Sequence, residues 1–107
     1  MRAVERARAQ SHVFRILGNP LCYRIILALG RGRLRPIELS AELGASAPAI
    51  VNQLRVLKIA GIVRYASTAE RRKGRKVHYW LADPAVFDAC RQLAGVMGKL
   101  WRAAGQA

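Results

Sequence analysis

A short segment near the middle of the chain carries polar side chains of the kinds that contact nucleic acids. They are one asparagine, one glutamine, one arginine and one lysine: Asn52, Gln53, Arg55 and Lys58. Asn and Gln can form paired hydrogen bonds with the edge of an adenine, while Arg and Lys bind guanine edges or phosphates. The segment therefore has the chemistry to contact base pairs, although ordinary solvated helix residues have the same composition.

The start of the same segment offers a second kind of contact. Ser46, Ala47 and Pro48 would open a helix, and the free backbone amides at a helix N-terminus favour a phosphate group. Ser46 is also a good N-cap, whose hydroxyl accepts a hydrogen bond from one of those amides. Both roles for Ser46 stay open on the sequence.

A cluster of basic side chains lies further along, around Gly74. Five cations occupy six positions there: Arg71, Arg72, Lys73, Arg75 and Lys76. A basic run is often only a solvated surface, but on a loop beside such a helix it favours phosphate or minor-groove contact. We expect this cluster to bind DNA.

The chain as a whole is strongly basic. Its 107 residues hold 19 Lys and Arg against 6 Asp and Glu, which gives a net charge of +13 at pH 7. Such a charge repels itself unless a polyanion neutralises it, so nucleic acid is the first candidate partner and an anionic membrane surface the second. No apolar run approaches the roughly 20 residues of a membrane span, and the N-terminus lacks a signal peptide. We expect one cytoplasmic domain, residues 1–107, with no membrane partner.

The segment with the polar side chains is predicted to be the second helix of a helix-turn-helix over residues 36–61. Pro36 suits the first position of the preceding helix, and Gly44 suits its end. Gly61 would end the second helix. Three apolar residues at helical spacing give that helix a buried face: Ile50, Leu54 and Leu57. Its polar residues would then face outward.

Two further helices are expected before this motif, over residues 3–17 and 20–29. Gly18 would end the first of them, and Asn19 would cap the second. After Gly61 the residues become β-branched and aromatic, which predicts two short strands.

The two strands, 62–65 and 77–81, would form a hairpin wing over residues 62–82. Its tip would be a long loop, 66–76, that carries the basic cluster. Asp83 and Pro84 suit the start of a last helix over 84–104. The fold class is therefore mainly α with a small β-hairpin.

The last helix has a wide apolar face, built from residues at helical spacing: Val86, Cys90, Leu93, Met97, Leu100 and Trp101. This face is larger than a lone surface helix needs. With Phe14 of the first helix it predicts a subunit interface, so that the terminal helices, 1–17 and 84–104, would form a dimer.

The order of these elements is that of a winged helix-turn-helix domain, and the residues resemble the ArsR/SmtB family of small dimeric repressors. The matching segments are 14–20, 39–44, 54–63 and 77–81 with Asp83-Pro84. The resemblance implies a homodimeric repressor that binds an imperfect DNA palindrome. The helix from Ser46 to Ala60 would lie in the major groove and the wing along the DNA backbone.

The chain departs from the metal sensors of that family. The segment Leu34–Leu39 lacks their cysteine pair, and Asp88 has no histidine near it in the sequence. We therefore expect no metal site and no cofactor. Catalysis is also not expected, because no phosphate-binding loop, nucleophile with its base, or paired carboxylates are present.

Two cysteines, Cys22 and Cys90, leave a thiol-based alternative open. They could form a redox-sensing pair, as in some members of the family, or be small buried hydrophobic residues. Two other functions stay open as well: a non-specific architectural nucleic-acid binder, and a module that docks another protein.

Overall fold

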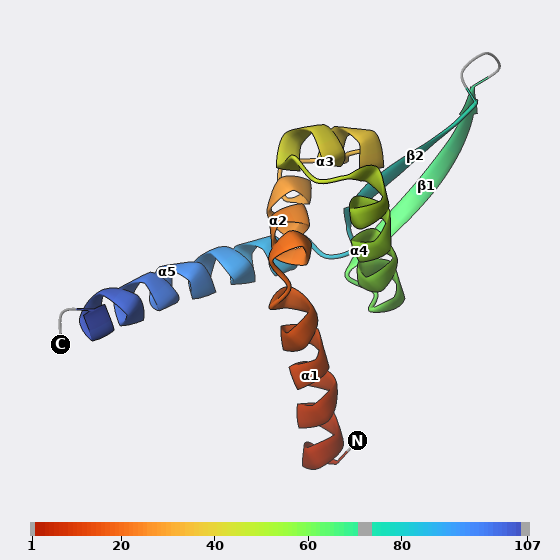
Figure 1. Cartoon of the computed structure of the whole chain (residues 1–107). Helices are drawn as coiled ribbons and strands as arrows, with labels where there is room; N and C mark the ends of the chain where they lie inside the picture. Colours follow the sequence, from red (N-terminus) through yellow and green to blue (C-terminus); the bar gives the residue numbers. More distant parts are fainter. Residues whose placement is uncertain (1, 71–73, 106–107) are drawn as a thin grey trace.

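The computed structural model describes residues 2–70 and 74–105. Its elements, in chain order, are α1 (Ala3–Leu17), α2 (Pro20–Leu29), α3 (Pro36–Leu43), α4 (Ala47–Ile59), β1 (Val63–Glu70), β2 (Gly74–Leu81) and α5 (Ala85–Gly105). Helices α2, α3 and α4 form a central cluster, from which the β1–β2 hairpin projects on one side and α1 and α5 extend on others (Figure 1). The structure confirms a winged helix-turn-helix fold.

The helix ends of the central cluster follow local signals in the sequence. Oδ1 of Asn19 accepts hydrogen bonds from the amides of Leu21 and Cys22, each at 3.0 Å, and caps α2. Ser46 caps α4 by accepting from the amide of Ala49 at 3.3 Å. These caps confirm the predicted starts of both helices.

Glycines with positive φ end both helices of the helix-turn-helix motif. Gly44 has φ +65° after α3, and Gly61 has φ +77° after α4. A side chain is strained in this conformation, so glycine suits both positions. Gly18 after α1 differs, because its φ of −73° is open to any residue.

The core lies between α2, α3, α4 and the base of the hairpin. Its most deeply buried members come from the three helices: Cys22, Ile25, Ile26, Leu39, Ile50, Leu54 and Leu57. Each large aliphatic side chain among them stabilises the fold by about 1.5–3 kcal/mol relative to its exposure to water. The predicted buried face of α4 is confirmed.

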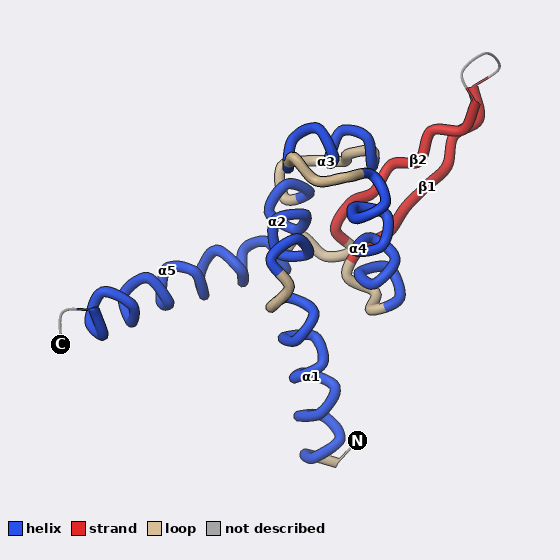
Figure 2. Tube along the Cα trace, viewed as in Figure 1, coloured by secondary structure: helices blue, strands red, loops and turns tan. Residues whose placement is uncertain are grey.

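The hairpin is longer than the sequence predicted. Its antiparallel register runs from Val63 opposite Leu81 to Glu70 opposite Gly74 (Figure 2). The predicted loop over 66–76 is therefore wrong, because most of it belongs to the two strands. Val63 and Leu81, at the base, are buried, whereas the outer part of β1 is exposed and lacks the apolar pattern that marks a strand.

The connection between α2 and α3 holds the hairpin base in place. Leu34 and Tyr79 exchange two backbone hydrogen bonds, with N–O distances of 3.1 and 2.8 Å. They form an isolated antiparallel bridge beside β2. The wing is thereby tied to the helical core.

Helices α1 and α5 leave large apolar side chains exposed. In these two helices only Ile16 and Cys90 are buried among the described residues. The exposed side chains include Phe14, Leu93, Val96, Met97, Leu100 and Trp101. Trp101 is 80% exposed, which is unusual for a free surface.

Candidate nucleic-acid interface

The outward face of α4 follows from its buried one. Because Ile50, Leu54 and Leu57 face the core, residues on the opposite side of the helix face solvent. Asn52, Arg55 and Lys58 are exposed, as the sequence predicted. Helix α4 lies at the edge of the central cluster, next to the hairpin, so this face is open to a large partner (Figure 1).

The same face of α4 carries apolar side chains that the sequence reasoning missed. Val51, Val56 and Ile59 are 42%, 40% and 79% exposed. Apolar side chains next to base-reading residues can contact the methyl group of thymine. The signal was present in the sequence, since all three residues fall outside the buried stripe.

The N-terminus of α4 has one amide suited to a phosphate. The amide of Ala49 already donates to Ser46, and Pro48 has no N–H group. Among the first three helical residues, this leaves the amide of Ala47. The predicted site at Ser46, Ala47 and Pro48 therefore reduces to one backbone donor and the positive end of the helix dipole.

Gln53 is placed differently from its neighbours on α4. It is half-buried, and its Oε1 accepts a hydrogen bond from the thiol of Cys22 on α2, with an Sγ–Oε1 distance of 3.1 Å. Its side chain thus turns toward α2 and not toward the side of Asn52 and Arg55. Contact between Gln53 and a base edge stays a prediction.

Lys58 joins the end of α4 to the wing. Its Nζ lies 4.8 Å from the centre of the Tyr65 ring on β1. Tyr65 in turn stacks on Tyr79 of β2, with ring centres 5.7 Å apart. This cation–π contact and stack hold the ammonium group of Lys58 beside the outward face of α4.

Arg33, in the connection before α3, is a basic residue beside the wing that was not predicted from the sequence. Its guanidinium carbon lies 4.0 Å from the centre of the Trp80 ring on β2. Arg33 is exposed and Trp80 half-buried, so the guanidinium remains reachable by an anion.

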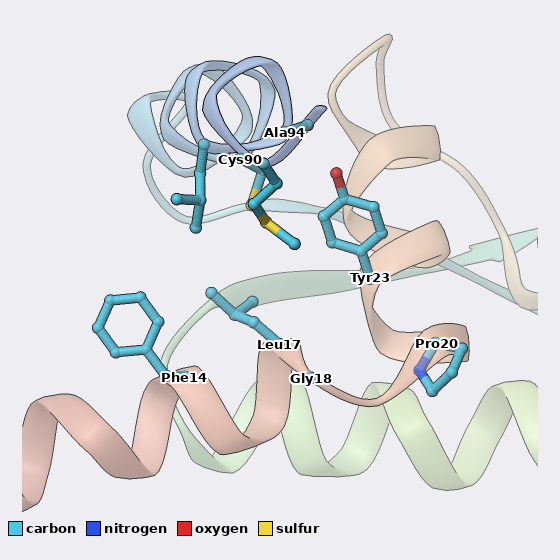
Figure 3. A pocket seen from close by; sticks show the side chains of 9 residues that line it. Phe14, Leu17, Gly18, Pro20, Tyr23, Cys90 and Ala94 are labelled. Carbon is cyan, nitrogen blue, oxygen red and sulfur yellow. The ribbon is translucent and has the colours of Figure 1, made fainter. Parts of the chain in front are cut away.

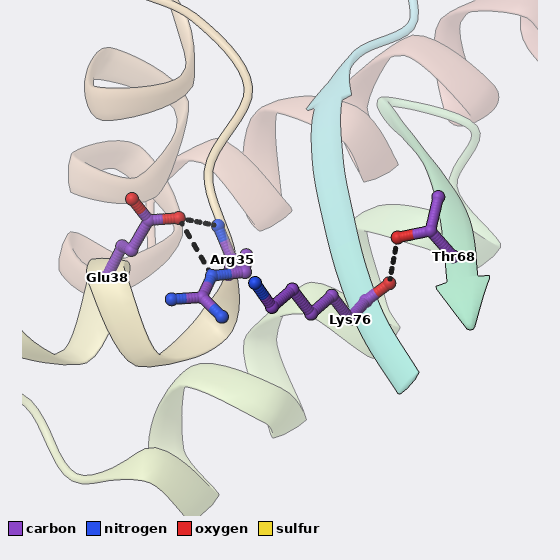
Figure 4. Close-up of polar contacts among 4 residues, drawn as sticks. All are labelled: Arg35, Glu38, Thr68 and Lys76. Atoms are coloured by element: carbon purple, nitrogen blue, oxygen red, sulfur yellow. Dashed lines mark hydrogen bonds and ion pairs between the residues drawn. The ribbon is translucent and has the colours of Figure 1, made fainter. Parts of the chain in front are cut away.

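The predicted basic cluster of the hairpin is only partly placed. Arg71, Arg72 and Lys73 lie outside the described residues. Arg75 pairs with Ala69 in the β ladder and Lys76 with Thr68. The hydroxyl of Thr68 donates to the backbone oxygen of Lys76 at 3.4 Å (Figure 4).

An acidic side chain near this surface is already neutralised. Oε1 of Glu38 accepts from the backbone amide of Arg35 at 2.9 Å and from its Nε at 3.3 Å (Figure 4). The backbone hydrogen bond is the main cause that lowers the pKa of Glu38, although its burial acts in the opposite direction. Glu38 is therefore a paired carboxylate that caps α3.

Both cysteines are free and buried. Burial raises the pKa of the Cys22 thiol and of the Cys90 thiol. A reactive cysteine needs the opposite change, because the thiolate is the nucleophile. The environment of the two thiols thus favours the small-hydrophobe interpretation over redox sensing.

An apolar groove lies between α1, α2 and α5. It has a volume of about 500 Å³, and its lining includes Phe14, Leu17, Tyr23, Cys90, Leu93 and Met97 (Figure 3). Four of the predicted interface residues, Phe14, Cys90, Leu93 and Met97, therefore line one surface. Leu100 and Trp101 extend the apolar surface along α5.

Within residues 2–70 and 74–105, no group of three or more His, Cys, Asp or Glu side chains is placed to hold a metal ion. Among the same residues, no helix is long and apolar enough to cross a membrane.

Comparisons with known proteins agree with this geometry. A family model described as bacterial regulatory protein, arsR family, matches residues 20–65. A transcriptional repressor SmtB homolog from Synechocystis sp. is 34% identical over 92 residues, which cover 86% of this chain and 66% of that protein. The HTH-type transcriptional regulator CmtR from Mycobacterium tuberculosis is 35% identical over 92 residues, which cover 86% of this chain and 74% of CmtR.

A solved structure has the same fold. It is the homodimeric winged helix-turn-helix DNA-binding domain Mb0332 from Mycobacterium bovis, at a TM-score of 0.75 and 20% identity. The match covers 92% of this chain and 86% of that domain.

Proposed function

The chain belongs to the ArsR family of bacterial transcriptional regulators, and from this premise we propose that it is a homodimeric repressor that binds an imperfectly palindromic DNA site. One observation carries the proposal. The outward face of α4 presents Asn52 and Arg55 beside exposed Val51 and Ile59, a mixture suited to base edges and thymine methyl groups. Repression then follows from occupancy of a promoter.

The proposal assigns the remaining contacts to the DNA backbone. Two of these groups flank the outward face of α4: the amide of Ala47 and the ammonium group of Lys58. A third group, the guanidinium of Arg33, flanks the wing. The hairpin cations from Arg71 to Lys76 would add phosphate or minor-groove contacts. Such contacts fix the register of the protein on the duplex without reading its sequence.

Dimerisation is the second part of the proposal. Residues 1–107 would form one domain whose helices α1 and α5 pair with those of a second copy. The exposed apolar side chains of α5 and the groove beside α1 support this, since a dimer would remove them from water. The Mycobacterium bovis domain of the same fold is itself homodimeric. A two-fold dimer would set two α4 helices about one turn of DNA apart.

Because the target is bacterial DNA, the proposal places the protein in the cytoplasm.

A selection from random duplex DNA tests this function. The proposal expects an enriched motif with two related half-sites, bound more tightly than a scrambled duplex at the same salt concentration. The high net charge favours one rival, a non-specific architectural binder. That rival predicts no enriched motif and equal affinity for both duplexes, and this result would overturn sequence-specific regulation.

A further inference from the structure

A buried thiol on α2 is hydrogen-bonded to the side chain of Gln53 on α4. Cys22 is 1% exposed, and its Sγ–H donates to Oε1 of Gln53 over 3.1 Å. The bond joins α2 to α4, two helices that share the core. Burial raises the pKa of the Cys22 thiol, so the proton that this bond requires is retained at neutral pH.

The other half of the Gln53 carboxamide is free. Within the described residues, Nε2 of Gln53 has no hydrogen-bond partner. Every buried side-chain nitrogen or oxygen of those residues has a hydrogen-bond partner. Because Nε2 has none, it is not buried and is accessible to solvent. A primary amide has one acceptor oxygen and one NH₂ donor group. Here the acceptor is used inside the protein and the donor is left available at the edge of α4.

We propose that Cys22 is a positioning residue for DNA recognition: by holding Oε1 of Gln53 inside the protein, it makes Gln53 a hydrogen-bond donor only. The inference rests on the proposed function, since it concerns how α4 meets DNA. Paired bonding with adenine requires both the nitrogen and the oxygen of the amide. Gln53 therefore does not read adenine in that way, and its NH₂ group instead donates to an acceptor of the DNA, either a phosphate oxygen or a base acceptor.

Substitutions at the two positions separate this role from a general packing role. Cys22→Ser keeps a donor, Cys22→Ala removes it, and Gln53→Ala removes the carboxamide. Without the thiol, the amide is free to turn its oxygen outward, where it would repel an acceptor on the DNA. We expect Cys22→Ala to weaken binding to the selected duplex about fivefold, the order of one hydrogen bond. Cys22→Ser should bind like the unmodified protein.

A double-mutant comparison gives the readout that packing alone would not move. In a Gln53→Ala background, Cys22→Ala should cause no further loss of DNA affinity, because the group it orients is gone. The side-chain NH₂ signals of Gln53, identified by their loss in Gln53→Ala, should shift in Cys22→Ala and stay in place in Cys22→Ser. This NMR measurement needs no DNA and also shows that each variant is folded.

The outcomes assign the donor and test the proposal. If Gln53→Ala loses affinity for the selected and the scrambled duplex alike, the NH₂ group contacts a phosphate. If the loss is confined to the selected duplex, the NH₂ group contacts a base. No loss on either duplex would overturn the inference. Equal losses for Cys22→Ala in both backgrounds would also overturn it and leave the proposed function standing. Failure of the unmodified protein to select any motif would instead contradict the proposed function itself.

Discussion

The ring of Phe87, at the start of α5, lies directly against the backbone of Gly30 at the end of α2. A Cβ atom on Gly30 would lie 2.1 Å from Cδ2 of this ring. The φ of Gly30 is −61°, so space and not backbone conformation excludes a side chain. This contact packs the start of α5 against the end of α2.

Gly30→Ala should destabilise the fold by about 1–3 kcal/mol, the usual cost of overpacking. Chemical denaturation of the variant measures this loss. The matched control is the same substitution in a Phe87→Ala background, where the ring no longer occupies the space. There the additional cost should largely disappear, and an equal cost in both backgrounds would show that the contact is not its cause.

Arg55→Ala should lower affinity for the selected duplex by about 1–3 kcal/mol, while affinity for a scrambled duplex changes little. The reason is that Arg55 lies on the outward face of α4, opposite the buried stripe. Fluorescence anisotropy titrations with both duplexes measure the two affinities. Lys99→Ala is the matched control, because it removes an exposed cation from α5. Equal losses on both duplexes would reduce Arg55 to a phosphate contact.

Arg72 and Lys73, which fall between β1 and β2 in the sequence, should act differently from Arg55. Removing both should weaken binding to all duplexes alike. Each lost phosphate contact should also flatten the salt dependence by about 0.9 in the log–log slope. Titrations at several salt concentrations measure this. A slope unchanged from that of the unmodified protein would exclude the wing from the backbone contacts.

Met97→Ser combined with Trp101→Ser should convert a dimer into a monomer. The two side chains are 57% and 80% exposed on α5 in a single chain, so their burial is expected to come from a second copy. Sedimentation equilibrium gives the mass of each variant. If the unmodified protein is itself monomeric at micromolar concentration, the dimeric repressor is contradicted.

The raised pKa values of Cys22 and Cys90 predict slow thiol chemistry. At pH 8, iodoacetamide should modify the native protein far more slowly than the denatured protein, because the thiolate is the reactive form. The folded state binds these protons more tightly than the unfolded state. The contribution of the two thiols to the free energy of unfolding should therefore be fully present below the thiol pKa of the unfolded chain, about 8.5. It should decrease as the pH rises above that value. Fast alkylation of the native protein would revive the thiol-sensing alternative.

Local signals in the sequence were sufficient for the helix-turn-helix. Asn19 and Ser46 cap their helices as predicted, and Gly44 and Gly61 adopt positive φ at the predicted ends. These assignments succeed because a cap or a glycine acts on residues only a few positions away.

Features that depend on packing between distant residues were not predicted. The outer hairpin continues by backbone pairing, as between Ser67 and Val77, where the exposed part of β1 gives no apolar signal. Gln53 follows Asn52 in the sequence, and only its contact with Cys22, 31 positions away, separates their roles. The close contact of Phe87 with Gly30 likewise joins α5 to a residue far away in the sequence.

The most direct test of the central claim is a binding measurement on α4 itself. The double variant Asn52→Ala/Arg55→Ala and the unmodified protein would be titrated with the selected duplex and with a scrambled duplex of the same composition, at one salt concentration. The regulator account predicts that the unmodified protein prefers the selected duplex and that the double variant loses this preference while still binding both duplexes through its basic surface. A double variant that retains the full preference would show that the outward face of α4 does not read the DNA sequence.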